Sequence, residues 1–172
     1  VYNVTDNSPA TQGNAYLGGT GYILQSFTIA YPSGPTNTLT GIQLTSGGTG
    51  NDQSDYSSVD LYRDSNSNGS YDVGVDTLVA SQTSFSGNNL PLTFTLPGSE
   101  SQFPAATSRR YFVVVGYNLA GASGTTFVSQ LTAISGTSFG ATLSGVPSPT
   151  GGPCAGLLLR GNNIDVIFNG PG

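Results

Sequence analysis

The residues best suited to chemistry lie in one stretch, residues 64–76, which reads DSNSNGSYDVGVD. Oxygen-bearing side chains occupy alternate positions there, and a glycine stands where a tight loop must turn sharply. This is the pattern of the first half of an EF-hand-type calcium loop, in which positions 1, 3 and 5 supply side-chain oxygens and position 7 a backbone carbonyl. The predicted Ca²⁺ ligands are Asp64, Asn66, Asn68, the Ser70 carbonyl, Asp72 and Asp76.

Charge and spacing both bear on this prediction. Asp76 stands at loop position 13 instead of 12, and Asp72, at position 9, can ligate directly or through water. Like charge concentrated in one segment is unfavourable unless a cation neutralises it. Six of the nine acidic residues fall in one segment: Asp52, Asp55, Asp60, Asp64, Asp72 and Asp76. The alternative is a solvated loop without an ion, because Asn, Ser and Gly also favour turns.

The segments on either side of the loop, SSVDLYRD and TLVAS, alternate between polar and apolar residues, so the loop is expected to join two strands. The same short alternating pattern, broken by Gly, Pro, Asn and Ser, recurs along the chain. It predicts strands at 1–5, 22–31, 38–46, 58–63, 77–83, 90–96, 111–117, 125–134, 138–145, 156–160 and 163–168. Short strands at this spacing predict an all-β fold, an antiparallel Ig-like or jelly-roll-type β-sandwich with the calcium loop between two strands. No linker divides the chain, so residues 1–172 are expected to form a single domain, in which 146–172 is a Gly/Pro-rich C-terminal segment with the last strand.

The composition excludes several classes of protein. Only 8% of the residues are charged, Lys and His are absent, and the net charge is −5, which argues against nucleic acid as a partner. No apolar run reaches the length of a membrane span. The lone Cys154 cannot form an internal disulfide; it is either a small buried apolar side chain or half of an intermolecular bridge. The start at Val1 without Met fits a secreted protein whose signal peptide has been removed.

An enzyme is not expected, because there is no His to act as a base and Cys154 has no His partner. Glu100 and Asp165 lie outside the calcium pattern, and we interpret them as strand or loop surface. A carbohydrate-binding module needs an aromatic platform, yet there is no Trp and the nine tyrosines are scattered. Asn3 (NVT) and Asn68 (NGS) lie in sequons that permit glycosylation.

The segment GTGNDQSDYSSVDLYRDSNSNGSYD, together with the following TLVAS strand, resembles calcium-binding Ig-like modules of bacterial and archaeal secreted surface proteins. Those modules carry a loop of the form D-x-N-x-N-G-x-x-D-x-x-D. The resemblance covers about residues 1–134, and its specific part is residues 48–80. It implies that Asp52 and Asp55, in the preceding loop, bind the same ion or a second one.

A stand-alone module of this kind is also similar to subunits of extracellular filaments and tubes, including calcium-assembled cannulae. This resemblance implies a secreted structural subunit that forms a homopolymer with copies of itself. Residues 1–8 would then be a donor-strand arm that pairs with a neighbouring subunit; the alternative is that they form the first strand of their own sheet. The alternative function is a monomeric cell-surface adhesive module that binds a glycan or another protein.

Overall fold

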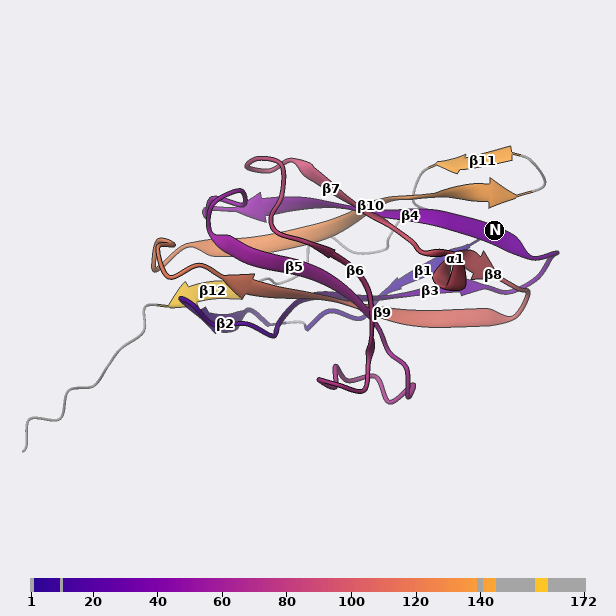
Figure 1. Cartoon of the computed structure of the whole chain (residues 1–172), viewed down its shortest axis with the longest axis horizontal. Coiled ribbons are helices and arrows are strands. Elements are labelled where there is room, and N and C mark those ends of the chain that lie inside the picture. Colours follow the sequence, from indigo (N-terminus) through magenta and orange to yellow (C-terminus); the bar gives the residue numbers. More distant parts are fainter. Residues whose placement is uncertain (1, 10, 139–140, 145–156, 161–172) are drawn as a thin grey trace, which may run out of the picture.

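Alternating apolar residues build two sheets that pack face to face (Figure 1), and the computed structural model describes residues 2–9, 11–138, 141–144 and 157–160 of this β-sandwich. One sheet has five strands: β1 (Asn3–Asp6), β3 (Tyr22–Tyr31), β9 (Thr107–Tyr117), β5 (Tyr56–Arg63) and β6 (Thr77–Gln82), in that spatial order. The other has seven, in the order β2 (Gly13–Tyr16), β12 (Leu157–Arg160), β10 (Thr126–Ser138), β4 (Asn37–Gly48) and β7 (Pro91–Thr95), with β11 (Ala141–Ser144) on β10 and β8 (Gln102–Phe103) on β4. The predicted β-sandwich is confirmed.

The hydrophobic core lies between the two sheets. The central strand β9 is buried on both faces, as its continuous apolar run predicts: Tyr111, Val113 and Val115 face the core, while Phe112 and Val114 are buried on the outer face. The alternation in β7 likewise places Leu92 and Phe94 in the core. The alternation of residues 90–96 predicts that Leu90 also faces the core, but Leu90 lies before β7 begins and is 47% exposed.

Irregularities in the strands explain where the expected pattern fails. A shift of register between β4 and β10 falls next to Gly41, where the sequence pattern changes phase and predicts a bulge. The four-residue strand β2 was not predicted, because GNAY does not alternate between apolar and polar residues. It pairs in parallel with β12, so the seven-stranded sheet is mixed instead of purely antiparallel. Cys154 and the strand predicted at 163–168 lie outside the described residues.

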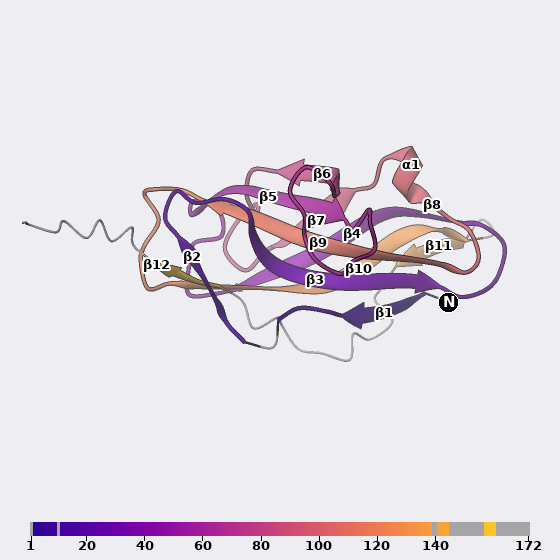
Figure 2. The ribbon, with the colours of Figure 1, turned by 90° about the horizontal axis from the view of Figure 1, so that it is seen from below.

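The N-terminal arm forms an edge strand of its own sheet. Strand β1 pairs antiparallel with β3 of the same chain and lies along its outer side (Figure 2). Tyr2, which is 4% exposed, anchors this edge, because its ring packs against Tyr31 at 5.2 Å and Phe103 at 5.7 Å between centroids. In this single chain the arm therefore follows the second of the two predicted alternatives.

Glu100 forms a cluster of ion pairs with Arg63 and Arg109, which belong to two strands of the five-stranded sheet. Glu100 lies in the short helix α1 (Gly98–Ser101) and is 3% exposed, so it is not the surface residue that the sequence suggests. Its carboxylate pairs with Arg63 Nη1 at 2.7 Å and Arg109 Nη1 at 3.4 Å. The cluster links α1 to the last residue of β5, directly before the predicted calcium loop. Within the described ranges, no helix is long and apolar enough to cross a membrane.

Candidate metal centre

The predicted calcium loop connects β5 to β6 and extends away from the two sheets, at the bottom of Figure 1. Its base is fixed on both sides. The Asp64 amide donates to the Arg110 carbonyl of β9 at 3.0 Å, and the hydroxyls of Ser65 and Thr77 are 2.7 Å apart. The loop is therefore held by a strand pair at its two ends, as the alternating flanks predict.

Carboxylates at the two ends of the loop hold it in a tight curl. Asp64 Oδ2 accepts the Gly69 amide at 2.9 Å, five residues further on. Gly69 has φ of 80°, a left-handed conformation that favours glycine and that suits the sharp turn expected at loop position 6. Asp76 accepts the amides of Ser65 (3.0 Å) and Asp72 (2.8 Å), so the closing acid reaches back to the start of the loop.

The middle of the loop is organised around Asp72. Its Oδ2 accepts hydrogen bonds from Asn66 Nδ2 at 2.9 Å and Asn68 Nδ2 at 2.7 Å. These two donors lower the pKa of Asp72 below its usual value. Ser70 belongs to the same turn, because its amide donates to Asn68 Oδ1 at 2.8 Å. Asn66, Asn68, Ser70 and Asp72 are therefore neighbours, and Asp72 is bonded to Asp76 in turn.

The residues present fit a calcium ion. Asp64 is 8% exposed, and its Oδ1 is buried without a hydrogen-bond partner among the described residues. A buried carboxylate oxygen with no partner is costly, and a cation would satisfy it. Nowhere in the described ranges do three or more Asp, Glu, His or Cys side chains group as a ready metal cluster. An ion here would therefore need the mixed set of carboxylate, carboxamide and carbonyl oxygens that Ca²⁺ accepts.

Asp52 and Asp55 are not brought to this loop. They precede β5, which is 8 residues long, so at about 3.3 Å per residue they lie roughly 25 Å from Asp64. They therefore cannot bind the same ion. Both carboxylates accept local hydrogen bonds: Asp55 accepts the Asn51 amide at 2.9 Å and the Ser54 hydroxyl at 3.0 Å, and Asp52 accepts the Asn89 amide at 3.0 Å. Asp52 Oδ1, like Asp64 Oδ1, is buried without a partner among the described residues. Burial, and then repulsion from Asp55, raise the pKa of Asp52.

Tyr71 ties the loop to the outer face of the five-stranded sheet, a role that the sequence did not reveal. Its ring lies 4.9 Å from that of Tyr62 and 6.0 Å from that of Phe112. Burial, together with its hydrogen bond and charge interaction with Tyr62, raises the pKa of Tyr71 to about 12. Tyr71 therefore covers the apolar side chain that β9 presents on its outer face.

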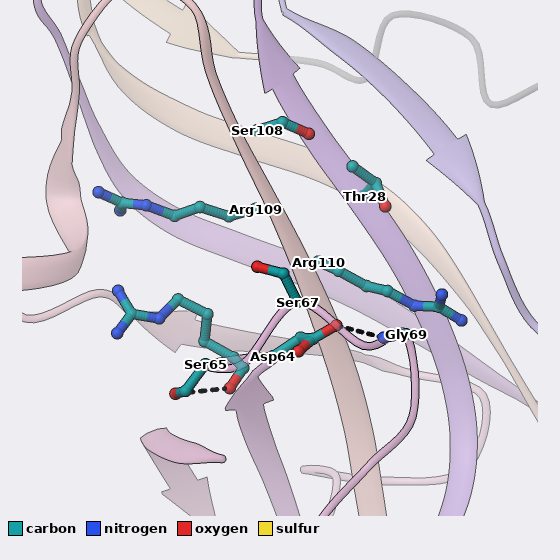
Figure 3. A pocket seen from close by; sticks show the side chains of 9 residues that line it. Thr28, Asp64, Ser65, Ser67, Gly69, Ser108, Arg109 and Arg110 are labelled. Atoms are coloured by element: carbon teal, nitrogen blue, oxygen red, sulfur yellow. Dashed lines mark hydrogen bonds between the residues drawn. The ribbon is translucent and has the colours of Figure 1, made fainter. Parts of the chain in front are cut away.

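A pocket of about 500 Å³ lies between this loop and the sheet (Figure 3). Three of the four arginines of the chain line it, although two of them are bound to Glu100. The full lining is Thr28, Arg63, Asp64, Ser65, Ser67, Gly69, Ser108, Arg109 and Arg110. The sequence gives no signal for this pocket, because its walls come from three separate segments.

No family model matches the chain, and no curated protein matches it either.

Proposed function

We propose that this protein is a secreted, calcium-stabilised structural subunit that assembles with copies of itself into an extracellular filament, tube or layer. The observation that carries the proposal is the N-terminal edge strand, which is four residues long and has one deeply buried anchor, Tyr2. An edge strand of this kind can be supplied by another copy, because backbone hydrogen bonds and one side-chain pocket define the pairing. Assembly would then proceed by donor-strand exchange.

The acceptor groove for such an exchange consists of the β3 edge and the aromatic pocket of Tyr31 and Phe103. Arg109 covers the other side of this pocket, since its guanidinium carbon is 4.3 Å from the Phe103 centroid. β1 ends at Asp6 and β2 begins at Gly13, and Asn7 and Ser8 hydrogen-bond to Ser26. The stretch between the two strands supplies the length needed for the arm to leave its own sheet.

Low surface charge supports association of copies. With 8% charged residues there is little repulsion between like surfaces. The alternating edges β1 and β6 contain neither Lys nor Pro, the residues that commonly protect an edge strand against pairing. Calcium would act within each subunit, on the loop between β5 and β6.

The alternative function, a monomeric adhesive module, gains little support from the tyrosines. Five of the nine are buried: Tyr2, Tyr31, Tyr56, Tyr111 and Tyr117. Tyr62 and Tyr71 pack on each other beside the loop, and Tyr16, at 48% exposure, is in β2. A sugar-stacking platform is therefore not formed by them, and any glycan would have to bind through polar groups.

Removing residues 1–8 tests the exchange. If copies exchange the arm, the truncated chain stays folded and monomeric, as measured by light scattering after gel filtration. A synthetic peptide of residues 1–8 should then bind it, whereas the matched peptide with Tyr2→Ser should bind at least tenfold more weakly, because burial of an aromatic ring is lost.

If the arm serves only its own sheet, the truncated chain assembles as the full chain does but melts at a lower temperature. A truncated chain that still polymerises would therefore rule the exchange out. Binding of both peptides with equal affinity would show that Tyr2 is not the anchor.

A further inference from the structure

The pocket beside the loop contains an arginine, Arg110, that pairs with no carboxylate of the described residues. Arg63 and Arg109 both pair with Glu100. The side chains of Arg109 and Arg110 extend to opposite sides of their strand (Figure 3). Arg160 lies elsewhere and donates to Asn14 Oδ1 at 3.1 Å. Among the described residues, Arg110 has no carboxylate within the 4.0 Å limit of an ion pair.

Arg110 is nevertheless held in a defined position. Its Nε donates to the Ser26 hydroxyl at 3.0 Å, and its guanidinium carbon lies 5.3 Å from the Phe112 centroid. Its Nη1 approaches Gly69 so closely that a Cβ on that glycine would lie 2.7 Å away. With Nε bound to Ser26, the two terminal nitrogens remain as donors, and a guanidinium fixed in this way is suited to binding an oxyanion.

The remaining walls of the pocket are hydrophilic. Apart from the charged residues and Gly69 they carry only hydroxyl side chains, from Thr28, Ser65, Ser67 and Ser108. Within the described residues, the hydroxyls of Ser67 and Ser108 make no hydrogen bond to the protein. Most ligand pockets are lined mainly by apolar groups, whereas this one has no aliphatic or aromatic side chain.

We infer that this pocket binds a sugar acid, with the carboxylate of the sugar on Arg110 and its hydroxyls on Ser67 and Ser108. The pocket volume of about 500 Å³ lies in the range of small-molecule sites and exceeds the size of a single inorganic ion. A sugar acid combines one oxyanion with many hydroxyls, which matches the lining. This inference goes beyond self-assembly, and it gives the assembled protein a way to hold acidic polysaccharide.

Calcium would strengthen this binding. Asp64 also lines the pocket, so its negative charge opposes an incoming carboxylate. An ion bound at Asp64 would neutralise that charge. The two sites are separable, however, because Arg110 is not a predicted calcium ligand.

The test is a titration of the full chain with glucuronate, followed by amide chemical shifts in ¹H–¹⁵N NMR, with glucose as the neutral control. We expect saturable shifts at Ser67, Gly69 and Ser108, and affinity for glucuronate at least tenfold above that for glucose. Arg110→Gln should weaken glucuronate binding at least tenfold, since a charge-assisted hydrogen bond is lost. Arg160→Gln removes an equal charge elsewhere and should leave the affinity unchanged.

A second variant guards against a folding defect in Arg110→Gln. Ser67→Glu places a carboxylate in the pocket and should abolish glucuronate binding without altering the melting temperature. Titrations in calcium and in chelator keep the two proposals apart, because dependence on Arg110 is expected in both. Equal binding of glucose and glucuronate, equal binding by Arg110→Gln, or no shifts at the pocket would overturn the inference.

Discussion

The two acidic loops at the ends of β5 differ in how they use their carboxylates. In the loop before β5, Asp55 accepts hydrogen bonds from the Asn51 amide and the Ser54 hydroxyl, Asp52 accepts one from the Asn89 amide, and the Asp52 amide donates to Asn88 Oδ1. Asp52 Oδ1 is nevertheless buried without a partner among the described residues. In the loop after β5, Asp64 Oδ1 is likewise buried without a partner among the described residues, and the carboxylates of Asp72 and Asp76 accept hydrogen bonds from the Asn66 and Asn68 side chains and from the Ser65 amide. Each loop therefore keeps one buried carboxylate oxygen without a partner among the described residues, but only the second loop has the alternating side-chain oxygens of a calcium loop.

The largest expected effect comes from the ion cluster that anchors the second loop. Glu100→Ala leaves Arg63 and Arg109 without their carboxylate, and breaking a buried pair costs about 3–5 kcal/mol. Because Arg63 is 30% exposed, we expect the lower end, about 3 kcal/mol. This corresponds to a fall of roughly 6–12 °C in melting temperature, measured by calorimetry.

The additional stability from calcium should survive Glu100→Ala, since the ligands come from the loop alone. Arg160→Gln, an exposed change outside the cluster, serves as the control and should alter the melting temperature little. Loss of the calcium effect in Glu100→Ala would show that the loop cannot form without its anchor.

Asp64→Ala and Asp55→Ala should show which of the two loops binds calcium. Calcium at 100 times its dissociation constant stabilises the native state by about 2.7 kcal/mol, which is roughly 5–11 °C for a domain of this size. Asp64→Ala should lose this increase. Asp55→Ala should keep it, although the variant itself is less stable, because Asp55 closes its own turn. A calcium shift that is unchanged in Asp64→Ala would make the second loop a plain turn.

The melting temperature of Asp52→Asn as a function of pH tests whether Asp52 serves only the structure of the first loop. Burial raises the pKa of Asp52, so its contribution to stability is fully present below the unfolded value of 3.8 and is lost as pH rises through the folded pKa. Asparagine keeps an acceptor for the Asn89 amide and removes the charge. The melting temperature of Asp52→Asn relative to the wild type should therefore rise between pH 4 and pH 7.

If Asp52 binds a second calcium ion instead, Asp52→Asn would reduce the number of ions bound per chain, as measured by calorimetric titration. An unchanged number of ions, together with the predicted pH trend, would assign Asp52 to loop structure.

The smallest effects are expected at two glycines within the second loop, Gly69 and Gly74. Both have φ of 80°, so alanine at either position should cost about 1 kcal/mol of backbone strain. Gly74 has no atom near an added Cβ, whereas Gly69 faces Arg110. Gly69→Ala should therefore also weaken calcium binding, because the turn at position 6 shifts, while Gly74→Ala should leave the affinity for calcium unchanged.

Strands with a clear alternation of polar and apolar residues could be predicted from the sequence. Strands that form only because a distant segment pairs with them could not. Strand β3 spans residues 22–31, as expected, because its long run alternates strongly. Strand β2 has no such pattern and exists because β12 pairs with it from a distance of more than 140 residues. The position of Glu100 was misjudged for the same reason, since its partners Arg63 and Arg109 are brought in by two other strands.

The candidate site was predictable in its local part. The spacing of Asp64, Gly69 and Asp76 anticipates the curl of the loop, because its hydrogen bonds are all within thirteen residues. The separation of Asp52 and Asp55 from this loop depends on the length of β5, which charge clustering in the sequence does not reveal. The pocket at Arg110 depends on the contact of the loop with β3 and β9, so it too required the structure.

The most direct test of self-assembly by strand exchange is negative-stain electron microscopy of the purified full chain, at saturating calcium and in chelator. We expect ordered filaments, tubes or layers in calcium, and we expect none when residues 1–8 are deleted. Single particles of one chain under calcium saturation, with no ordered assembly at any protein concentration, would contradict this expectation.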